Sequence, residues 1–418
     1  MFWRNWNTML ATMVSSARAQ IGRRSRQARS ILAAEGYRGI IDRARSKASD
    51  WLKPQTEAWP VFPDDVLAAD LSHPPDIAEP PLEEGEQITV NWIIGPAGPG
   101  SGGHTTAFRI LNFLEKLGYR NRVYFYDPYG GDLQYFTDIA RDYYKLNCEI
   151  ANARRGMKDA HAVVATSWAS AYAAYNAKCS GKRFYFIQDF EPFFYPTSTN
   201  SLLAENTYRM GFHGITAGRW LADKLTREFG MKTDHFPFGC DTAQYRRSAG
   251  SERKGIAFYA RSHTPRRAVE LGILALEIFA KRHPDVELHL FGQHLGALPF
   301  RFTNHGPSNP AKLNDIYNKC FAGLCLSLTN VSLVPYEMLA CGCIPIVNDG
   351  PQNRVVLENA FVRFADPTPI SLAQELEAVM GAPDREDISR KAAESVTLTS
   401  WDTAGAAVDA ALRRALQP

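Results

Sequence analysis

The chain has 418 residues, of which 45% are hydrophobic and 22% charged, and its formal net charge is +3. This length is more than one hydrophobic core usually serves, so the sequence predicts two or three soluble globular domains. The near balance of charge excludes a chain whose whole surface binds nucleic acid, and no nucleic-acid partner is expected.

Residues 1–53 are a strongly basic N-terminal extension, with nine arginines and two lysines against three acidic residues. Large apolar side chains recur in this segment at helical spacing: Phe2, Trp3, Trp6, Leu10, Met13 and Val14. The pattern predicts an amphipathic helix, and an anionic membrane surface is its expected partner. A basic helix whose apolar stripe docks on the protein itself fits the pattern equally well.

The segment from residue 54 to 86 is rich in proline and acidic residues, which predicts an extended linker. Trp59, Val61 and Phe62 are costly to leave in water, so contact of this linker with the globular part is also consistent with the sequence.

From residue 87 onward, short apolar strands alternate with helical patterns, and this predicts an α/β fold with parallel sheets. The alternation restarts after a loop near residue 246. We therefore expect two Rossmann-like, doubly wound domains, residues 87–246 and 247–395, followed by a closing helix at 396–418. Ligands bind such sheets at the carboxyl ends of their strands, so the two domains are expected to face an inter-domain cleft.

A glycine-rich loop, GPAGPGSGGHTT, joins the first strand to the first helix of this region. Gly98, Gly100 and Gly103 satisfy the G-x-G-x-x-G pattern of dinucleotide sites, but Pro99 and the extra glycine at Gly102 depart from it. A nucleoside triphosphate loop would have lysine after the glycines. We expect Gly102 and Gly103 to present backbone N–H groups to an anionic ligand, the alternative being a tight turn that binds nothing.

The second region carries two arginines, Arg261 and Arg266, at the end of its first strand and at the start of the next helix. Two guanidinium groups near a helix N-terminus suit a diphosphate, although a pair of solvated surface arginines has the same sequence. Glu337 stands near the start of a later helix, where a carboxylate suits a ribose diol. An exposed helix acid is the alternative there.

These motifs resemble those of retaining, family 4 type glycosyltransferases of the GT-B fold. Ala260 to Arg266 is similar to the G-R-L-x-x-x-K stretch of that family, with arginine in place of lysine. Thr329 to Glu337 aligns with E-G-F-G-L-x-x-x-E: Leu333 and Glu337 are kept, Thr329 replaces the first glutamate, and Asn330, Val331 and Ser332 replace G-F-G. The run from FIQDFEPFFYP to GITAGRWLA more narrowly resembles WsaF-type rhamnosyltransferases of bacterial polysaccharide clusters.

The resemblance covers residues 88–410 and implies a glycosyltransferase that acts on a growing surface glycan. The implied donor is a nucleotide sugar, dTDP-rhamnose in the narrower family, and the implied acceptor is a lipid-linked or free oligosaccharide. It also implies retention of anomeric configuration, no cofactor and no metal, and a closing helix that crosses back to the first domain. The expected location is cytoplasmic, with peripheral attachment to the inner face of the cell membrane. The seven scattered cysteines are expected to be reduced thiols.

The expected site residues follow from these motifs and from the strand RFYFIQD, whose end faces the predicted cleft. The expected catalytic residues are Asp189, Arg261 and Arg266, with Asp189 beside the transferring sugar or the acceptor hydroxyl. The expected donor-binding residues are Gly102, Gly103, Arg261, Arg266, Gly292, Asn330, Ser332, Leu333 and Glu337. The expected acceptor-binding residues are His104, Gln188 and Glu191. The alternative for the QDFEP acids is a role as loop caps.

Two functions of other classes remain open from the sequence. One is a nucleotide-sugar epimerase on the same two-domain fold, which would need no acceptor. The other is a non-catalytic subunit of a polysaccharide assembly complex, which the loss of the first glutamate at Thr329 would permit.

Overall fold

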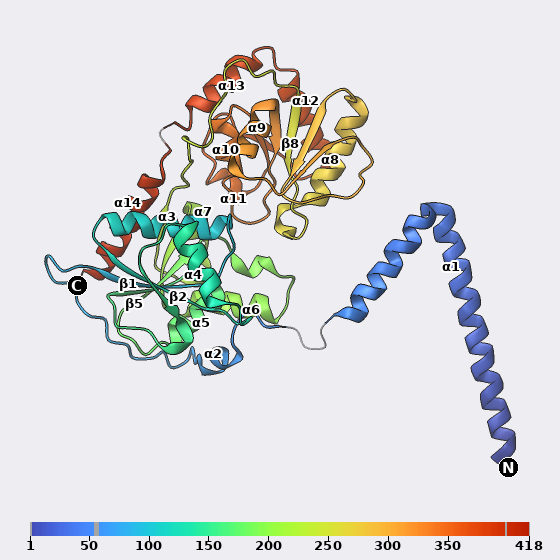
Figure 1. Cartoon of the computed structure of the whole chain (residues 1–418), viewed down its shortest axis with the longest axis horizontal. Coiled ribbons are helices and arrows are strands. Elements are labelled where there is room, and N and C mark those ends of the chain that lie inside the picture. Colours follow the sequence, from blue (N-terminus) through green and yellow to red (C-terminus); the bar gives the residue numbers. More distant parts are fainter. Residues whose placement is uncertain (1, 54–57, 398, 418) are drawn as a thin grey trace. The chain divides into compact units, whose positions relative to one another are not determined.

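The computed structural model (Figure 1) describes residues 2–53, 58–397 and 399–417, with side chains from residue 25 onward. It divides into an N-terminal unit, residues 1–58, and a main unit, residues 59–418.

The N-terminal unit is one long helix, α1 (Phe2–Leu52), drawn in blue in Figure 1. Its course changes at Gly36, whose φ of 65° and ψ of −164° lie outside the helical region and suit glycine. The apolar stripe predicted on Phe2, Trp3, Trp6, Leu10, Met13 and Val14 lies outside the described side chains. Farther along the helix, Tyr37, Trp51 and Leu52 are exposed, as are the arginines around them.

The first sheet of the main unit has seven parallel strands in the order β3-β2-β1-β4-β5-β6-β7. Its strands are β1 (Thr89–Ile94), β2 (Arg120–Phe125), β3 (Glu149–Asn152), β4 (Ala162–Ala165), β5 (Lys182–Ile187), β6 (His213–Ala217) and β7 (Thr233–Phe236). Its helices are α3 (Gly102–Lys116), α4 (Leu133–Asp142), α5 (Trp168–Asn176), α6 (Thr199–Asn206) and α7 (Arg219–Phe229). In this sheet the sequence pattern missed the two edge strands, β3 and β7, because they are short and partly exposed.

The second sheet has six parallel strands in the order β10-β9-β8-β11-β12-β13. Its strands are β8 (Gly255–Tyr259), β9 (Glu287–Phe291), β10 (Thr303–Gly306), β11 (Cys320–Leu324), β12 (Ile344–Asn348) and β13 (Arg363–Ala365). Its helices are α8 (Val269–Arg282), α9 (Pro310–Lys319), α10 (Val334–Ala340), α11 (Pro351–Arg354), α12 (Pro369–Met380) and α13 (Arg385–Glu394). The α/β class with two parallel, doubly wound sheets is therefore confirmed.

The segment that precedes β1 is packed on the first sheet's layers rather than left as a free tether. It contains a short helix, α2 (Pro63–Ala68), and Val61 beside it is fully buried. Tyr126 donates a hydrogen bond to Asp65 at 2.7 Å, and the N–H of Gly181 donates to the carbonyl of Ala78. The contact of this segment with the globular part, which the sequence left open, is thus present in its described part after residue 58.

The last helix, α14 (Trp401–Leu416), packs against α3 and β7, on the first sheet's side of the main unit. Gly405 faces the ring of Phe113 so closely that an added Cβ would lie 2.4 Å from it. Tyr119 donates to Asp409 at 2.6 Å, which fixes the same contact from its polar side.

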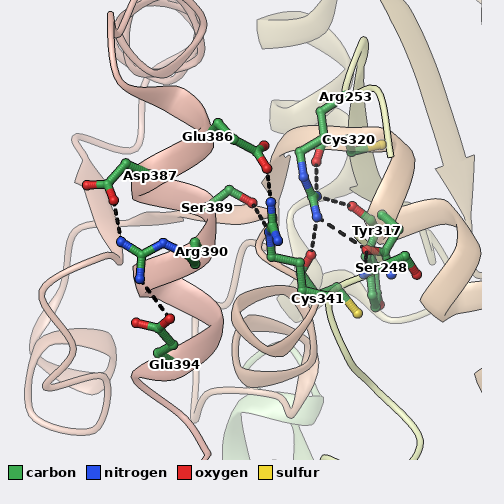
Figure 2. A network of polar contacts seen from close by, with 12 residues as sticks. Ser248, Arg253, Tyr317, Cys320, Cys341, Glu386, Asp387, Ser389, Arg390 and Glu394 are labelled. Carbon is green, nitrogen blue, oxygen red and sulfur yellow. Dashed lines mark hydrogen bonds and ion pairs between the residues drawn. The ribbon is translucent and has the colours of Figure 1, made fainter. Parts of the chain in front are cut away.

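Half-buried arginine side chains anchor the chain where it enters the second sheet, as Figure 2 shows. The guanidinium of Arg253 donates to the carbonyl oxygens of Tyr317, Cys320 and Cys341. Arg247 pairs with Glu386 and donates to Ser389, both on α13. The segment before β8 is therefore tied to the ends of α9 and α10 and to α13. All seven cysteines are buried free thiols.

Candidate functional site at the carboxyl ends of the strands

Asp189 lies where loops of the two sheets meet. It follows β5 by two residues, and its side chain is nearly buried. One carboxylate oxygen accepts from the backbone N–H groups of Phe190 and Asn330, both at 2.9 Å. The other accepts from the hydroxyl of Thr329 at 3.1 Å and lies 3.1 Å from the Nε of Arg266.

These contacts bear on the role expected for Asp189. Both carboxylate oxygens are occupied by protein donors, and two of the donors, Thr329 and Asn330, come from the loop after β11. In this structure Asp189 therefore has a structural role at the junction of the loops, and its expected position beside the transferring sugar or acceptor hydroxyl stays a prediction.

Asn330 also connects the loops of the two sheets. Its side-chain amide donates to the carbonyl oxygens of Gln188, at 2.9 Å, and Ala217, at 2.8 Å. These carbonyls end β5 and β6, and Asn330 itself is fully buried. Asn330, expected to bind the donor, thus links the loop after β11 to the first sheet through these two hydrogen bonds, which we call the clasp of Asn330. Its amide satisfies backbone carbonyls that would otherwise be buried unpaired.

The two arginines of the expected diphosphate clamp have different surroundings. Arg266, in the turn Pro265–Arg267, is half-buried, and its guanidinium lies 4.0 Å over the ring of Phe194 as well as beside Asp189. Its Nε–H does not point along the line to Asp189, so the contact is an ion pair rather than an aligned hydrogen bond. Arg261 is exposed and donates to His263 at 2.7 Å.

The adjacent Arg267 is a site residue that the sequence did not single out. It donates to the hydroxyl of Ser327 at 2.7 Å and more distantly to the carbonyl of Asn330. Burial lowers the pKa of its guanidinium. Arg267 therefore holds the loop after β11 through these hydrogen bonds. In the sequence, only its position as the second arginine of the RR pair indicated it.

The glycine-rich loop is held together by His104. Its two ring nitrogens lie 2.8 Å from the hydroxyl of Ser101 and 2.8 Å from the carbonyl of Gly95. Burial lowers the pKa of this imidazole, so it is neutral and has one donor and one acceptor nitrogen to match those partners. His104 thus shapes the loop instead of facing an acceptor.

Gln188 connects this loop to the end of β5. Its side-chain amide donates to the carbonyl of Gly103 at 2.9 Å. Gly102 and Gly103 are exposed at the start of α3, and the Ser101 hydroxyl that could cap the helix is engaged with His104 instead. The first N–H groups of α3 have no intrahelical acceptor, which keeps the expected anion-facing role in place.

Glu191 has the alternative role expected for this segment, that of a capping acid. It is buried, and its carboxylate accepts from the N–H of Trp168, the first residue of α5, at 2.6 Å. Burial raises the pKa of Glu191 to about 8. Its expected contact with an acceptor is therefore corrected, because the side chain points to the helix start and not to solvent.

The remaining expected donor residues lie in loops after β9 and β11. Glu337 is in the first turn of α10, where the hydroxyl of Tyr317 donates to it at 3.3 Å. Burial raises its pKa to about 7, although the positive charge of Arg109 opposes the shift. Leu333 is the N-cap of α10, and Ser332, just before it, is half-buried.

Gly292, directly after β9, has a φ of 110°, and an added Cβ would lie 3.0 Å from the ring of Tyr259. Only glycine suits both the backbone angle and the space at this position. The packing of Tyr259 and the backbone angle thus account for the glycine at this position.

The part of the chain that the structure describes contains neither a candidate metal cluster nor a candidate membrane-spanning helix. No group of three or more His, Cys, Asp or Glu residues in it is placed to hold a metal ion. No helix in it is both long and apolar enough to cross a membrane.

Two stretches of the chain match models of one protein family. Residues 147–217 match the model described as "WsaF, N-terminal domain", and residues 254–377 match "WsaF, C-terminal domain". The O-antigen biosynthesis protein RfbC of Myxococcus xanthus is 30% identical over an alignment of 386 residues, and the alignment covers 87% of this chain and 30% of that protein. The chain thus spans less than a third of the length of this relative.

Solved structures share the fold at low identity. Anabaena Alr3699/HepE in complex with UDP and glucose matches with a TM-score of 0.60 and 13% identity, over 78% of this chain and 100% of that one. Sucrose-phosphate synthase from Thermosynechococcus elongatus matches with a TM-score of 0.59 and 14% identity, over 79% and 99%. The chain thus resembles the WsaF proteins over the two matched stretches, in the order N-terminal then C-terminal domain, and it shares the GT-B fold of these solved structures.

Proposed function

We propose that the chain is a glycosyltransferase of surface polysaccharide synthesis that moves a sugar from a nucleotide diphosphate to a growing glycan. The observation that carries the proposal is the position of Arg266. It lies in the turn after β8, beside the first sheet's loops, in a chain with both WsaF domains. The O-antigen relative and a neighbour that holds UDP and glucose support the same class of reaction.

The proposed chemistry is stabilisation of a leaving diphosphate. Glycosyl transfer moves negative charge onto that group, and fixed guanidinium groups in a partly desolvated site lower the energy of this charge. Arg261 and Arg266 would bind the diphosphate, and Glu337 would accept hydrogen bonds from the ribose diol. In this proposal the arginines do the electrostatic work without a metal ion, and the anomeric configuration is retained.

The finer substrate assignments rest on the narrower family likeness. The proposed donor is dTDP-rhamnose, and the proposed acceptor is a lipid-linked or free oligosaccharide that faces the glycine-rich loop. Gly102 and Gly103 are exposed there, next to Gln188.

We also propose that the N-terminal helix attaches the protein to the inner face of the cell membrane. In its described part, exposed Arg26, Arg29 and Arg38 accompany exposed Tyr37 and Trp51. Basic residues are attracted by anionic headgroups, and aromatic residues prefer the interface.

The variants Arg261→Ala and Arg266→Ala test the proposed clamp. Each is expected to lower the rate of sugar transfer from a nucleotide-sugar donor by about 100-fold, the size typical for loss of one transition-state electrostatic contact. Arg363→Ala, which removes an exposed arginine at the start of β13, is the matched control and should retain activity. Transfer that survives both substitutions would rule out the clamp; epimer formation without acceptor would identify an epimerase instead.

A thermal-shift screen tests the donor. If dTDP-rhamnose is the donor, it should raise the unfolding temperature more than UDP-glucose or GDP-mannose at equal concentration, because a ligand that binds only the folded state stabilises it. A larger shift with a UDP or GDP sugar would overturn the dTDP assignment while leaving the reaction class in place.

The raised pKa of Glu337, about 7 against an ordinary 4.5, predicts a pH dependence of donor binding. The ionised carboxylate is the better acceptor for the ribose diol, so affinity for the sugar nucleotide should rise about tenfold from pH 6 to pH 8. Isothermal titration of the wild type and Glu337→Gln measures it; the variant should lack the rise. An equal pH dependence in both proteins would exclude Glu337 from ribose binding.

The raised pKa of Glu337 also lowers folding stability as pH rises from about 4.5 through 7, because the folded form holds the proton more tightly than the unfolded form.

Deletion of residues 1–53 tests the membrane proposal. The full chain should sediment with phosphatidylserine-containing vesicles at low salt and be released by high salt, whereas the shortened chain should stay in the supernatant. Phosphatidylcholine vesicles, which lack net charge, provide the control. Equal sedimentation of the two proteins would refute attachment through this helix.

A further inference from the structure

The guanidinium that the proposed function assigns to the diphosphate is already occupied in this structure. Arg266 belongs to the second sheet's loops, yet its two closest side-chain partners, Asp189 and Phe194, both follow β5 of the first sheet. The ion pair is largely shielded from water, since the two side chains are only 25% and 11% exposed.

We propose that Asp189 is a positioning residue that competes with the donor diphosphate for Arg266, so that a sugar nucleotide must displace Asp189 before Arg266 can clamp it. This inference rests on the proposed function, since it takes Arg266 to be a diphosphate ligand. It replaces the direct catalytic role that the sequence suggested for Asp189.

The contacts of Asp189 make such an exchange feasible. When Arg266 leaves, the carboxylate keeps the hydroxyl of Thr329 and the N–H groups of Phe190 and Asn330. Three neutral donors still satisfy a buried anion, so its charge is not stranded. The exchange therefore breaks the ion pair without undoing the clasp of Asn330 on the first sheet.

The surroundings of Arg266 point the same way. Its Nε–H is not aligned with Asp189, so the ion pair lacks the directional component of a strong hydrogen bond. Phe194 adds a cation–π contact at 4.0 Å, which favours the held position by a modest amount. Arg261, in contrast, is exposed and donates to the ring of His263 and not to a carboxylate, so a diphosphate can reach it without displacing an anionic side chain.

Competition of this kind weakens apparent affinity by the fraction of molecules in which Arg266 is free. Asp189→Asn keeps the size of the side chain and an oxygen for the N–H groups of Phe190 and Asn330, but removes the negative charge. It should therefore bind dTDP about five- to tenfold more tightly than the wild type, a difference that isothermal titration resolves. UDP or GDP replaces dTDP as the probe if the thermal-shift screen favours that base.

The matched control is Asp234→Asn. Asp234 also forms a partly buried ion pair, with Arg414 at 2.6 Å, but it lies on β7 and does not contact Arg266. Its variant should leave dTDP affinity unchanged. A second variant, Phe194→Leu, removes the cation–π contact at a half-buried position and should tighten binding about two- to threefold. It gives an independent result if Asp189→Asn does not fold.

Arg266→Gln separates this inference from the proposed function. In the Arg266→Gln background, Asp189→Asn should have no effect on dTDP affinity, because the competing cation is gone. The competition is overturned if Asp189→Asn and Phe194→Leu bind dTDP as tightly as the wild type or more weakly, while Arg266→Gln still weakens dTDP binding. That result leaves the clamp intact. Tighter binding by Asp189→Asn in the Arg266→Gln background also overturns it. If Arg266→Gln itself leaves dTDP affinity unchanged, the clamp, and with it the proposed function of Arg266, fails.

Discussion

A nearly buried carboxylate, Asp189, is the constraint on which the meeting of the two sheets depends. An anion removed from water must find donors, and Asp189 finds them on three segments: its own loop, the turn after β8 and the loop after β11. Because two of these segments belong to the second sheet, satisfying this one charge fixes how the strand ends of both sheets face one another. Asn330 completes the junction by taking up two backbone carbonyls of the first sheet.

Positive side chains shielded from water also find hydrogen-bond partners beside each sheet. Arg183 donates to four backbone carbonyls, including those of Ala174 and Ala177 at the end of α5. Arg253 does the same for carbonyls near the ends of α9 and α10 (Figure 2). Helix C-termini present unpaired carbonyls and a partial negative charge, so one buried guanidinium satisfies both. These arginines are basic residues in the sequence but internal braces in the fold.

Local patterns were reliable where burial is periodic and unreliable where it depends on partners far away in the chain. The inner strands are continuous apolar runs, so the sequence predicted them and with them the parallel sheets. The edge strands of both sheets, β3, β7, β10 and β13, are short and partly exposed, and they were missed. Among the site residues, Arg266 was found from its motif. The lowered pKa of His104 and the burial of Glu191 could not be predicted from the sequence, because both depend on burial that only the folded chain produces.

The sequence alone determined the order of the elements, the glycine-rich turn before α3, and the positions of Arg261 and Arg266 after β8 and of Glu337 near the start of α10. Those features depend on hydrophobic period, turn chemistry and short spacing, all of which are local. Only the tertiary structure decided which of these groups are free. It paired Arg266 with Asp189, directed Glu191 to the start of α5 and made Asn330 a clasp rather than a donor contact. The physical reason is that the protonation and availability of a polar side chain depend on its burial and its partners, and these partners lie up to about 140 residues away in the chain.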